Sequence, residues 1–210
     1  AIMVTVHGYT PSGNCLKVRQ ILELTQTPFT WVETDSNAGA TRSAGYLALN
    51  PNGKVPMVVL ADGTVITESN AILCHFAEGT RFLPAPGLAR TRVLEWLFFE
   101  QYSHEPTIAV ARNWITYKRI KQQRANDLVA IWEGGYRALS VMERRLAEAD
   151  FLAGDGFTVA DIALFAYTHR ADEGEFDLSA FAGVRAWIAR ISALPGIRLL
   201  PRPQPPTQGG

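Results

Sequence analysis

With 210 residues, the chain is long enough for one large or two small domains, and its 47% hydrophobic content supplies a core. Twenty basic and 20 acidic residues cancel to a net charge of zero, which removes the general electrostatic footprint of a nucleic-acid binder. No apolar run approaches the roughly 20 residues of a membrane span, and the first residues lack the pattern of a signal peptide. We therefore expect a cytoplasmic protein with neither nucleic acid nor membrane as a partner.

The cysteines and histidines give no sign of a metal site or a disulfide framework. Cys15 and Cys74 lie far apart and form no C-x-x-C pair. The four histidines have no metal-ligand spacing with one another. We expect no metal.

The first 80 residues alternate strand and helix signals, which predicts a βαβ unit followed by a hairpin and a helix. The predicted elements are strands at Val4–Gly8 and Phe29–Glu33, helices at about Asn14–Thr25 and Thr41–Leu49, a hairpin of Met57–Leu60 and Val65–Thr67, and a helix at Asn70–Glu78.

Residues 80–88 are rich in proline and glycine and break the periodicity, so they are interpreted as a linker. Beyond them only helical spacing appears, over Arg90–Ile120, Asn126–Ala149, Val159–Asp172 and Leu178–Ala193. The predicted organisation is a domain at 1–79, a linker at 80–88, an all-helical domain at 89–200, and an irregular or mobile proline-rich tail at 201–210. Within the second domain, Thr158 and Asp161 have the spacing of a capping box with Asp in place of Glu, which indicates a structural helix start.

Residues 50–70 place three backbone features within one short stretch. Pro56 lacks a backbone donor and so belongs at the mouth of a strand, which leaves the backbone of Val55 exposed to a ligand. Asp62-Gly63 between two apolar runs is a strong hairpin signal. Ser69 or Glu68 is expected to cap the helix that follows, and the free N–H groups at such a helix start attract a carboxylate or a phosphate.

Three segments, in this order and spacing, resemble the cytosolic glutathione transferases of bacterial type. The segments are Asn50 to Pro56, Glu68 to Ile72, and the helix start from Thr158 to Leu164. The resemblance covers nearly the whole chain. It implies an α/β plus all-α fold, with a thioredoxin-like N-terminal domain (βαβαββα) followed by an all-helical domain. It also implies glutathione as co-substrate and a symmetric homodimer.

The resemblance further implies which residues bind glutathione. In the family a cis peptide precedes the proline that matches Pro56, and it exposes the backbone that matches Val55 to the cysteinyl part of glutathione. Glu68 and Ser69 would hold the γ-glutamyl end, with Ser69 on the carboxylate and Glu68 facing the amino group. Lys54 lies where related enzymes place a polar or basic residue near the glycyl carboxylate, and Arg42 is a second candidate for that end.

The residue that activates the thiol should lie directly after the first strand, between Tyr9 and Cys15. A free thiol has a pKa of about 8.5, so forming thiolate at neutral pH requires a depression of one to two units. Ser12 matches the first serine of the run seen in serine-type members, and Asn14 offers an amide donor as in some bacterial members. Cys15 would act through a mixed disulfide, although its spacing favours a packing role, and Tyr9 favours packing or contact with the second substrate.

The acceptor substrate should lie between this loop and the helices after the linker, where Tyr9, Tyr102 and Arg112 are candidate contacts. The leading hypothesis is a glutathione transferase of detoxification type, which conjugates the thiolate to a hydrophobic electrophile. The alternatives are a glutathione-dependent peroxidase or disulfide-bond reductase, acting on a peroxide or a disulfide, and a non-catalytic binding protein of the same family.

Overall fold

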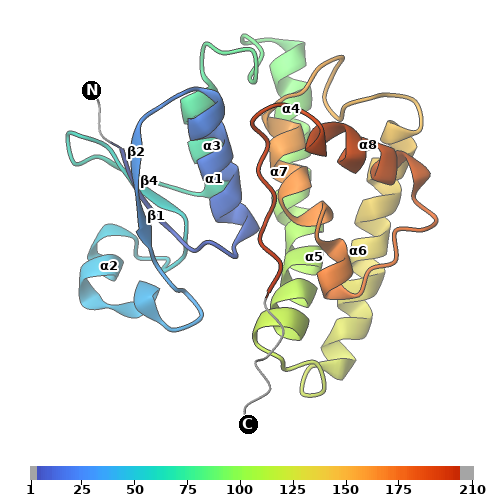
Figure 1. The fold of residues 1–210 in the computed structure, drawn as a ribbon, viewed down its shortest axis with the longest axis horizontal. Helices are drawn as coiled ribbons and strands as arrows, with labels where there is room; N and C mark the ends of the chain where they lie inside the picture. The colour runs from blue at the N-terminus through green and yellow to red at the C-terminus, as the bar shows by residue number, and fades with distance from the viewer. Residues whose placement is uncertain (1–3, 204–210) are drawn as a thin grey trace.

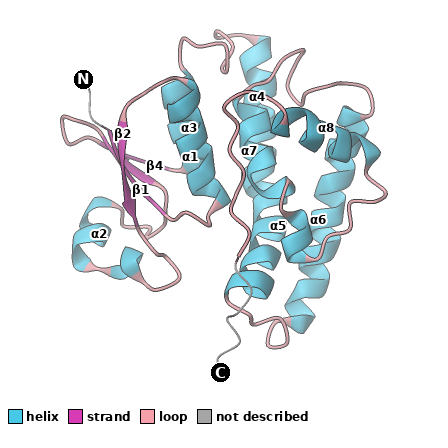
Figure 2. Ribbon diagram, viewed as in Figure 1, coloured by secondary structure: helices cyan, strands magenta, loops and turns pink. Residues whose placement is uncertain are grey.

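The computed structural model describes residues 4–203. Figure 1 shows a small sheet and its helices on one side and a bundle of longer helices on the other, with the chain after the last helix running back between the two halves. Figure 2 shows that all strands lie in the N-terminal half. The predicted thioredoxin-like domain and all-helical domain are thus both present.

The sheet has four strands in the order β2-β1-β3-β4. β1 (Val4–Gly8) pairs in parallel with β2 (Phe29–Glu33) and antiparallel with β3 (Met57–Val59), which pairs antiparallel with β4 (Val65–Thr67). The parallel pair requires a crossover, which α1 supplies. The Asp-Gly hairpin is confirmed, with Gly63 at φ +86° in its turn.

Two helices, α1 (Gly13–Leu24) and α3 (Ser69–Ala77), cover one face of the sheet and separate it from the helical half (Figure 1). α2 (Ala44–Leu49) lies on the opposite side, preceded by a 3₁₀ turn, η1, at Ala40–Arg42. The core between the sheet and its two covering helices consists of small and branched apolar side chains: Val4, Val6, Val18, Leu22, Val58 and Ile72.

The helical half begins with α4 (Leu88–Phe99) and α5 (Glu105–Arg112). The π-helical segment η2 (Glu100–His104) joins them, and a second, η3 (Asn113–Tyr117), follows α5. The predicted helix at Arg90–Ile120 is therefore one helical run over residues 88–117, with one π-helical segment in its middle and a second at its end. Such segments are enriched at functional sites.

Three further helices complete this half. They are α6 (Ala125–Leu146), α7 (Val159–Thr168) and α8 (Ala182–Ser192), with a 3₁₀ turn, η4, at Ala171–Gly174. α7 is buried along its whole length and contacts α1, so it forms the centre of the molecule. The predicted capping box at its start is confirmed: the N–H of Thr158 donates to Asp161 Oδ2 at 3.0 Å, and Thr158 Oγ1 accepts from the N–H of Ala160 in the first turn.

Several predicted element ends shift in the structure. α2 begins at Ala44, with Ser43 as its N-cap, and α8 begins at Ala182. Glu68 is the N-cap residue of α3, as one of the two alternatives predicted, but its φ is +66° and its side chain makes no capping hydrogen bond. The predicted domain boundaries stay a prediction. Of the predicted tail, residues 201–203 carry no regular structure, and residues 204–210 lie outside the described part.

Candidate active site

A cavity of about 330 Å³ opens between the sheet half and the helical half. Its walls come from the loop after β1, the loop before β3, the start of α3, and the run from η2 to η3. The residues that line it are Tyr9, Pro11, Ser12, Asn14, Ser36, Asn37, Asn50, Lys54, Val55, Pro56, Glu68, Ser69, Gln101, Glu105, Ala109, Val110, Arg112, Asn113, Trp114, Tyr117 and Tyr167.

The predicted cis peptide between Val55 and Pro56 is confirmed. Both residues line the cavity. Two donors hold the preceding carbonyl of Lys54: Tyr46 Oη at 2.6 Å and Asn50 Nδ2 at 2.8 Å. Because each hydrogen bond contributes about 1 kcal/mol, this pair fixes the course of the backbone that enters Val55.

The start of α3 presents Glu68 and Ser69 to the cavity. A φ of +66° is unusual for a residue other than glycine, and such strained backbone gathers at ligand sites. Ser69 is buried, and its hydroxyl donates to Asn14 Oδ1 at 3.2 Å. With both residues at a helix N-terminus, the site carries free backbone donors and a positive dipole end.

A fully buried ion pair lies directly beneath Ser69. Lys17 Nζ on α1 lies 2.8 Å from Glu100 Oε1 on η2, and neither side chain has any exposed surface. The same ammonium donates to Ser69 Oγ at 3.3 Å and to Asn70 Oδ1 at 3.2 Å. Asn70 Nδ2 in turn donates to Glu100 Oε2 at 3.0 Å. This network ties α1, α3 and η2 together under the floor of the cavity.

Ser12 lies at the N-cap of α1 and faces the cavity. Its Oγ accepts from the N–H of Cys15 at 3.4 Å, and a hydroxyl that accepts one hydrogen bond can still donate its own hydrogen. Burial raises the pKa of the Cys15 thiol to about 11, which keeps it protonated at neutral pH and agrees with a packing role. A Cβ at Gly13 would lie 2.7 Å from the ring of Tyr167, so the turn that presents Ser12 requires glycine there.

Asn14 lines the cavity beside the start of α3. Its Oδ1 accepts from Ser69 Oγ, and its Nδ2 donates to Glu105 Oε1 at 3.3 Å. Its backbone N–H donates to Tyr167 Oη on α7 at 3.2 Å. Burial raises the pKa of Glu105, while Lys17 and Asn14 oppose that shift. The amide therefore links the start of α3 to the helical half.

The remaining predicted residues divide into three placements. Tyr9 and Arg112 line the cavity, and burial raises the pKa of Tyr9, so its hydroxyl stays protonated at neutral pH. Arg112 is buried in a salt bridge with Glu173 at 2.7 Å. Tyr102 is 89% exposed and Arg42 packs over Gly53, and neither belongs to the cavity lining.

Comparison with known proteins agrees with this geometry. Residues 11–78 match the model of the glutathione S-transferase N-terminal domain, and residues 108–195 match that of the C-terminal domain. The chain belongs to the glutathione S-transferase family. The fold and the family implied by the resemblance of the three segments are thus confirmed.

Three similar proteins illustrate the range of this family. A glutathione S-transferase from Xanthobacter autotrophicus Py2 is 57% identical, with 96% of this chain and 97% of that chain covered and a TM-score of 0.91. The disulfide-bond oxidoreductase YfcG of Escherichia coli is 26% identical over 89% of each chain. Ure2p in complex with glutathione is 25% identical, with 92% and 95% covered and a TM-score of 0.82.

Sequence reasoning missed four residues that support the site: Lys17, Tyr46, Glu105 and Tyr167. Lys17, Glu105 and Tyr167 bond to partners far away in the chain, and Tyr46 bonds to the backbone carbonyl of Lys54, so no local motif marks them. A charged residue on the apolar face of α1, as Lys17 is, was the one available signal. Within residues 4–203, no group of three or more ligating side chains gathers into a metal site, and no helix has the length and apolarity of a membrane span.

Proposed function

We propose that the protein is a glutathione transferase, which stabilises the glutathione thiolate and conjugates it to a hydrophobic electrophile. The observation that carries this proposal is the cavity that joins Val55, Glu68 and Ser69 to Ser12. Glutathione would lie with its γ-glutamyl end at α3, its cysteinyl backbone along Val55 and its glycyl carboxylate toward Lys54, with Arg42 behind Gly53. Ser12, beside the positive end of α1, would donate to the sulfur.

The proposed conjugation requires only that the site lower the thiol pKa and hold the two substrates together. A hydroxyl donor and a helix N-terminus lower the thiol pKa, and bound geometry places the thiolate against the acceptor. Val110 and Trp114 offer an apolar wall next to Tyr9 for such an acceptor. We extend the proposal to a cytoplasmic detoxification role.

Ser69→Ala is expected to weaken glutathione binding about 10- to 100-fold, because a hydrogen bond to a charged carboxylate contributes about 1.5–3 kcal/mol. Isothermal titration calorimetry with glutathione measures the change. Ser43→Ala, which removes an exposed serine at the N-cap of α2, is the matched control and should bind normally. Normal affinity in Ser69→Ala would contradict the placement of the γ-glutamyl carboxylate.

A second candidate function is glutathione-dependent disulfide reduction. The acceptor side of the cavity carries the polar groups of Ser36, Asn37 and Asn113, which suit a peptide-like disulfide, and the similar YfcG is a disulfide-bond oxidoreductase. The thiolate would attack one sulfur of the disulfide, its S–S bond would break, and the leaving thiolate would take a proton. A second glutathione would then resolve the mixed disulfide and form glutathione disulfide.

Two activity assays distinguish conjugation from disulfide reduction. Turnover of a chloro-nitroaromatic acceptor supports conjugation, whereas turnover of a small disulfide such as hydroxyethyl disulfide, without conjugation, supports the reductase. Activity on a peroxide alone would assign the peroxidase alternative. Glutathione binding with no turnover of any acceptor would favour a non-catalytic binding protein.

A homodimer remains part of the proposal, and α4 together with η2 offers the surface for it. Leu94, Phe98 and Tyr102 follow one another at four-residue spacing, and the latter two are 74% and 89% exposed. Such a stripe of large apolar side chains is typical of an interface. Tyr102, expected at the acceptor site, lies on this surface instead.

Phe98→Glu is expected to convert the protein to monomers, because it places a charge in the centre of this stripe. Sedimentation velocity measures the mass. Val129→Glu on α6 is the control, since Val129 is also an exposed apolar residue, at 55%, on a different face. A dimer that survives Phe98→Glu would contradict an interface on α4.

A further inference from the structure

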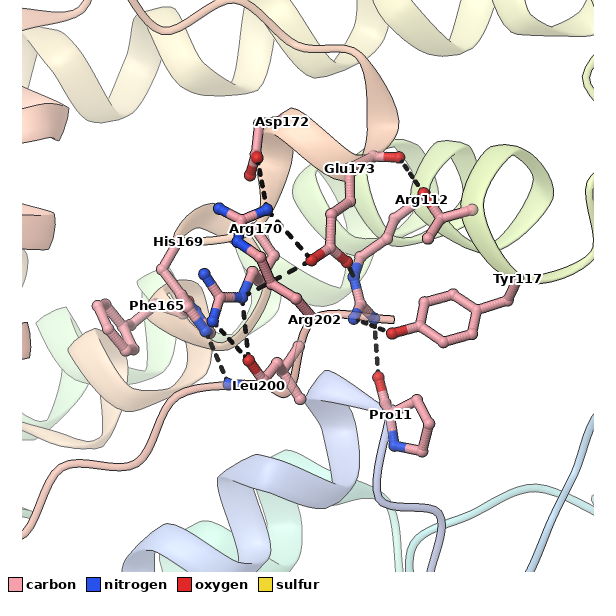
Figure 3. Close-up of polar contacts among 11 residues, drawn as sticks. Pro11, Arg112, Tyr117, Phe165, His169, Arg170, Asp172, Glu173, Leu200 and Arg202 are labelled. Atoms are coloured by element: carbon pink, nitrogen blue, oxygen red, sulfur yellow. Dashed lines mark hydrogen bonds and ion pairs between the residues drawn. The ribbon is translucent and has the colours of Figure 1, made fainter. Parts of the chain in front are cut away.

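The guanidinium of Arg112 connects the helical half to the loop that precedes Ser12. Its Nη1 donates to the carbonyl oxygen of Pro11 at 2.7 Å. Its Nε donates to Glu173 Oε2 at 2.7 Å, and its Nη2 donates to Tyr117 Oη at 2.7 Å. Figure 3 shows the group between these partners. Because a guanidinium is planar and rigid, these contacts fix it and therefore fix the Pro11 carbonyl.

The other side of the same loop is held by the sheet half. Glu33 at the end of β2 accepts from the N–H of Thr10 at 2.8 Å and from its hydroxyl at 2.7 Å. Pro11 follows, with φ fixed by its ring. The backbone on the N-terminal side of Ser12 is thus set from two directions, and only Arg112 reaches it from the helical half among the hydrogen bonds of residues 4–203.

Glu173 on η4 holds Arg112 and is itself surrounded by arginines. Its side chain is 5% exposed. Its Oε1 receives no hydrogen bond from the described residues, but it lies 3.7 Å from Arg170 Nε and 3.6 Å from Arg202 Nη1. The Glu173 carboxylate thus lies between Arg112 on one side and Arg170 and Arg202 on the other (Figure 3).

The chain after α8 is anchored at this cluster. Arg170 donates to the carbonyl of Leu200 through Nε at 3.0 Å and Nη2 at 2.6 Å, and the N–H of Leu200 donates to His169 Nε2 at 3.0 Å. Arg202 Nη1 pairs with Asp172 Oδ2 at 2.7 Å. Residues 200–202 therefore have a defined position beside Glu173.

We infer that Arg112 is a positioning residue for the loop that bears Ser12, and that residues 200–202 hold Arg112 in place through Glu173. The inference rests on the proposed function, in which a donor on this loop stabilises the glutathione thiolate. Arg112 acts through the backbone of Pro11 and needs no contact with the substrate.

Arg112→Lys is the principal test. A lysine keeps a positive charge beside Glu173, but one ammonium cannot serve the same partners in a fixed plane, so the loop shifts. Because displacement of about 1 Å costs up to about 100-fold in rate, we expect kcat to fall about tenfold or more, with the KM for glutathione within about twofold. The thiol pKa of bound glutathione, followed by thiolate ultraviolet absorbance, should rise. Unchanged kcat and thiol pKa would overturn the inference.

A double variant separates positioning from general support of the fold. If Arg112 acts through Ser12, then Ser12→Ala/Arg112→Lys loses no more activity than Ser12→Ala alone. Multiplied losses would overturn the inference. Should Ser12→Ala alone leave the thiol pKa unchanged, the role proposed for Ser12 fails, whereas a raised thiol pKa in Arg112→Lys still supports positioning of this loop for another donor.

The C-terminal part of the inference is tested by Arg202→Ala against Arg198→Ala. Both remove a half-exposed arginine from the same segment, but Arg198 pairs with Glu23 on α1. Because exposed ion pairs are weak, we expect Arg202→Ala to lower kcat about two- to fivefold and Arg198→Ala to leave it unchanged. Equal effects would overturn the role of residues 200–202, and this comparison stands even where Arg112→Lys does not fold.

Discussion

Lys17→Met is expected to lower the free energy of unfolding by about 3–5 kcal/mol, because it leaves the carboxylate of Glu100 buried without its counter-charge. Lys17 and Glu100 have no exposed surface, and their charged atoms lie 2.8 Å apart. Asn70 Nδ2 and Gln101 Nε2 still donate to Glu100 Oε2, but neutral donors do not balance a buried charge. Urea denaturation measures the loss.

Lys121→Met is the matched control for this prediction. Lys121 pairs with Glu175 at 2.6 Å, but both side chains are more than two-fifths exposed. An exposed pair contributes about 0–1 kcal/mol, so the same substitution should cost little there. The double variant Lys17→Met/Glu100→Leu should recover part of the stability, since it removes both buried charges. A loss in Lys17→Met no larger than in Lys121→Met would contradict the buried-charge account.

The same pair also supports the end of the cavity at the start of α3. Lys17 donates to Ser69 Oγ, which donates to Asn14 Oδ1, whose amide donates to Glu105. A chain of polar groups thus runs from α1 through the start of α3 to α5, across both halves of the molecule. Because such networks orient each member, the direction of the Ser69 hydroxyl depends on its partners Lys17 and Asn14.

The local parts of the fold could be predicted from sequence. β1, β2 and β4 have their predicted bounds, because short runs of β-branched residues ended by glycine, proline or a turn are strong local signals. The capping box at Thr158 was equally clear, since both partners lie within three positions. The cis peptide at Val55 and the glutathione family came from the resemblance rather than from periodicity.

The residues that support the site could not be predicted, because their contacts join positions far apart in the sequence. Arg112 contacts Pro11 and Glu173, and Tyr167 contacts Asn14, with separations of 61 to 153 residues. Helical spacing assigns such side chains to a face but not to a partner. Tyr102 on η2 shows the same limit, because helical spacing left open whether it faced the cavity or solvent.

Ser12→Ala is expected to raise the thiol pKa of bound glutathione by about one to two units and to lower the rate at neutral pH about 10- to 100-fold. The hydroxyl stabilises only the charged sulfur, so its loss favours the thiol. At pH values well above the raised pKa both enzymes hold mainly thiolate, and their rates should converge. The pH dependence of kcat/KM and thiolate absorbance measure this directly, while glutathione affinity below the thiol pKa should stay nearly constant.

Two further variants make the assignment of Ser12 specific. Ser12→Thr keeps the hydroxyl, and threonine also serves as an N-cap for α1. This variant should therefore keep most of the depression of the thiol pKa of bound glutathione. Asn14→Ala should instead weaken glutathione binding, because the Asn14 amide bonds to Ser69 and Glu105. It should leave the thiol pKa within about half a unit of wild type, which is less than the shift expected for a lost donor to a charged sulfur. The reverse pattern, with the thiol pKa responding to Asn14 and not to Ser12, would transfer the sulfur contact to the amide and favour the disulfide reductase.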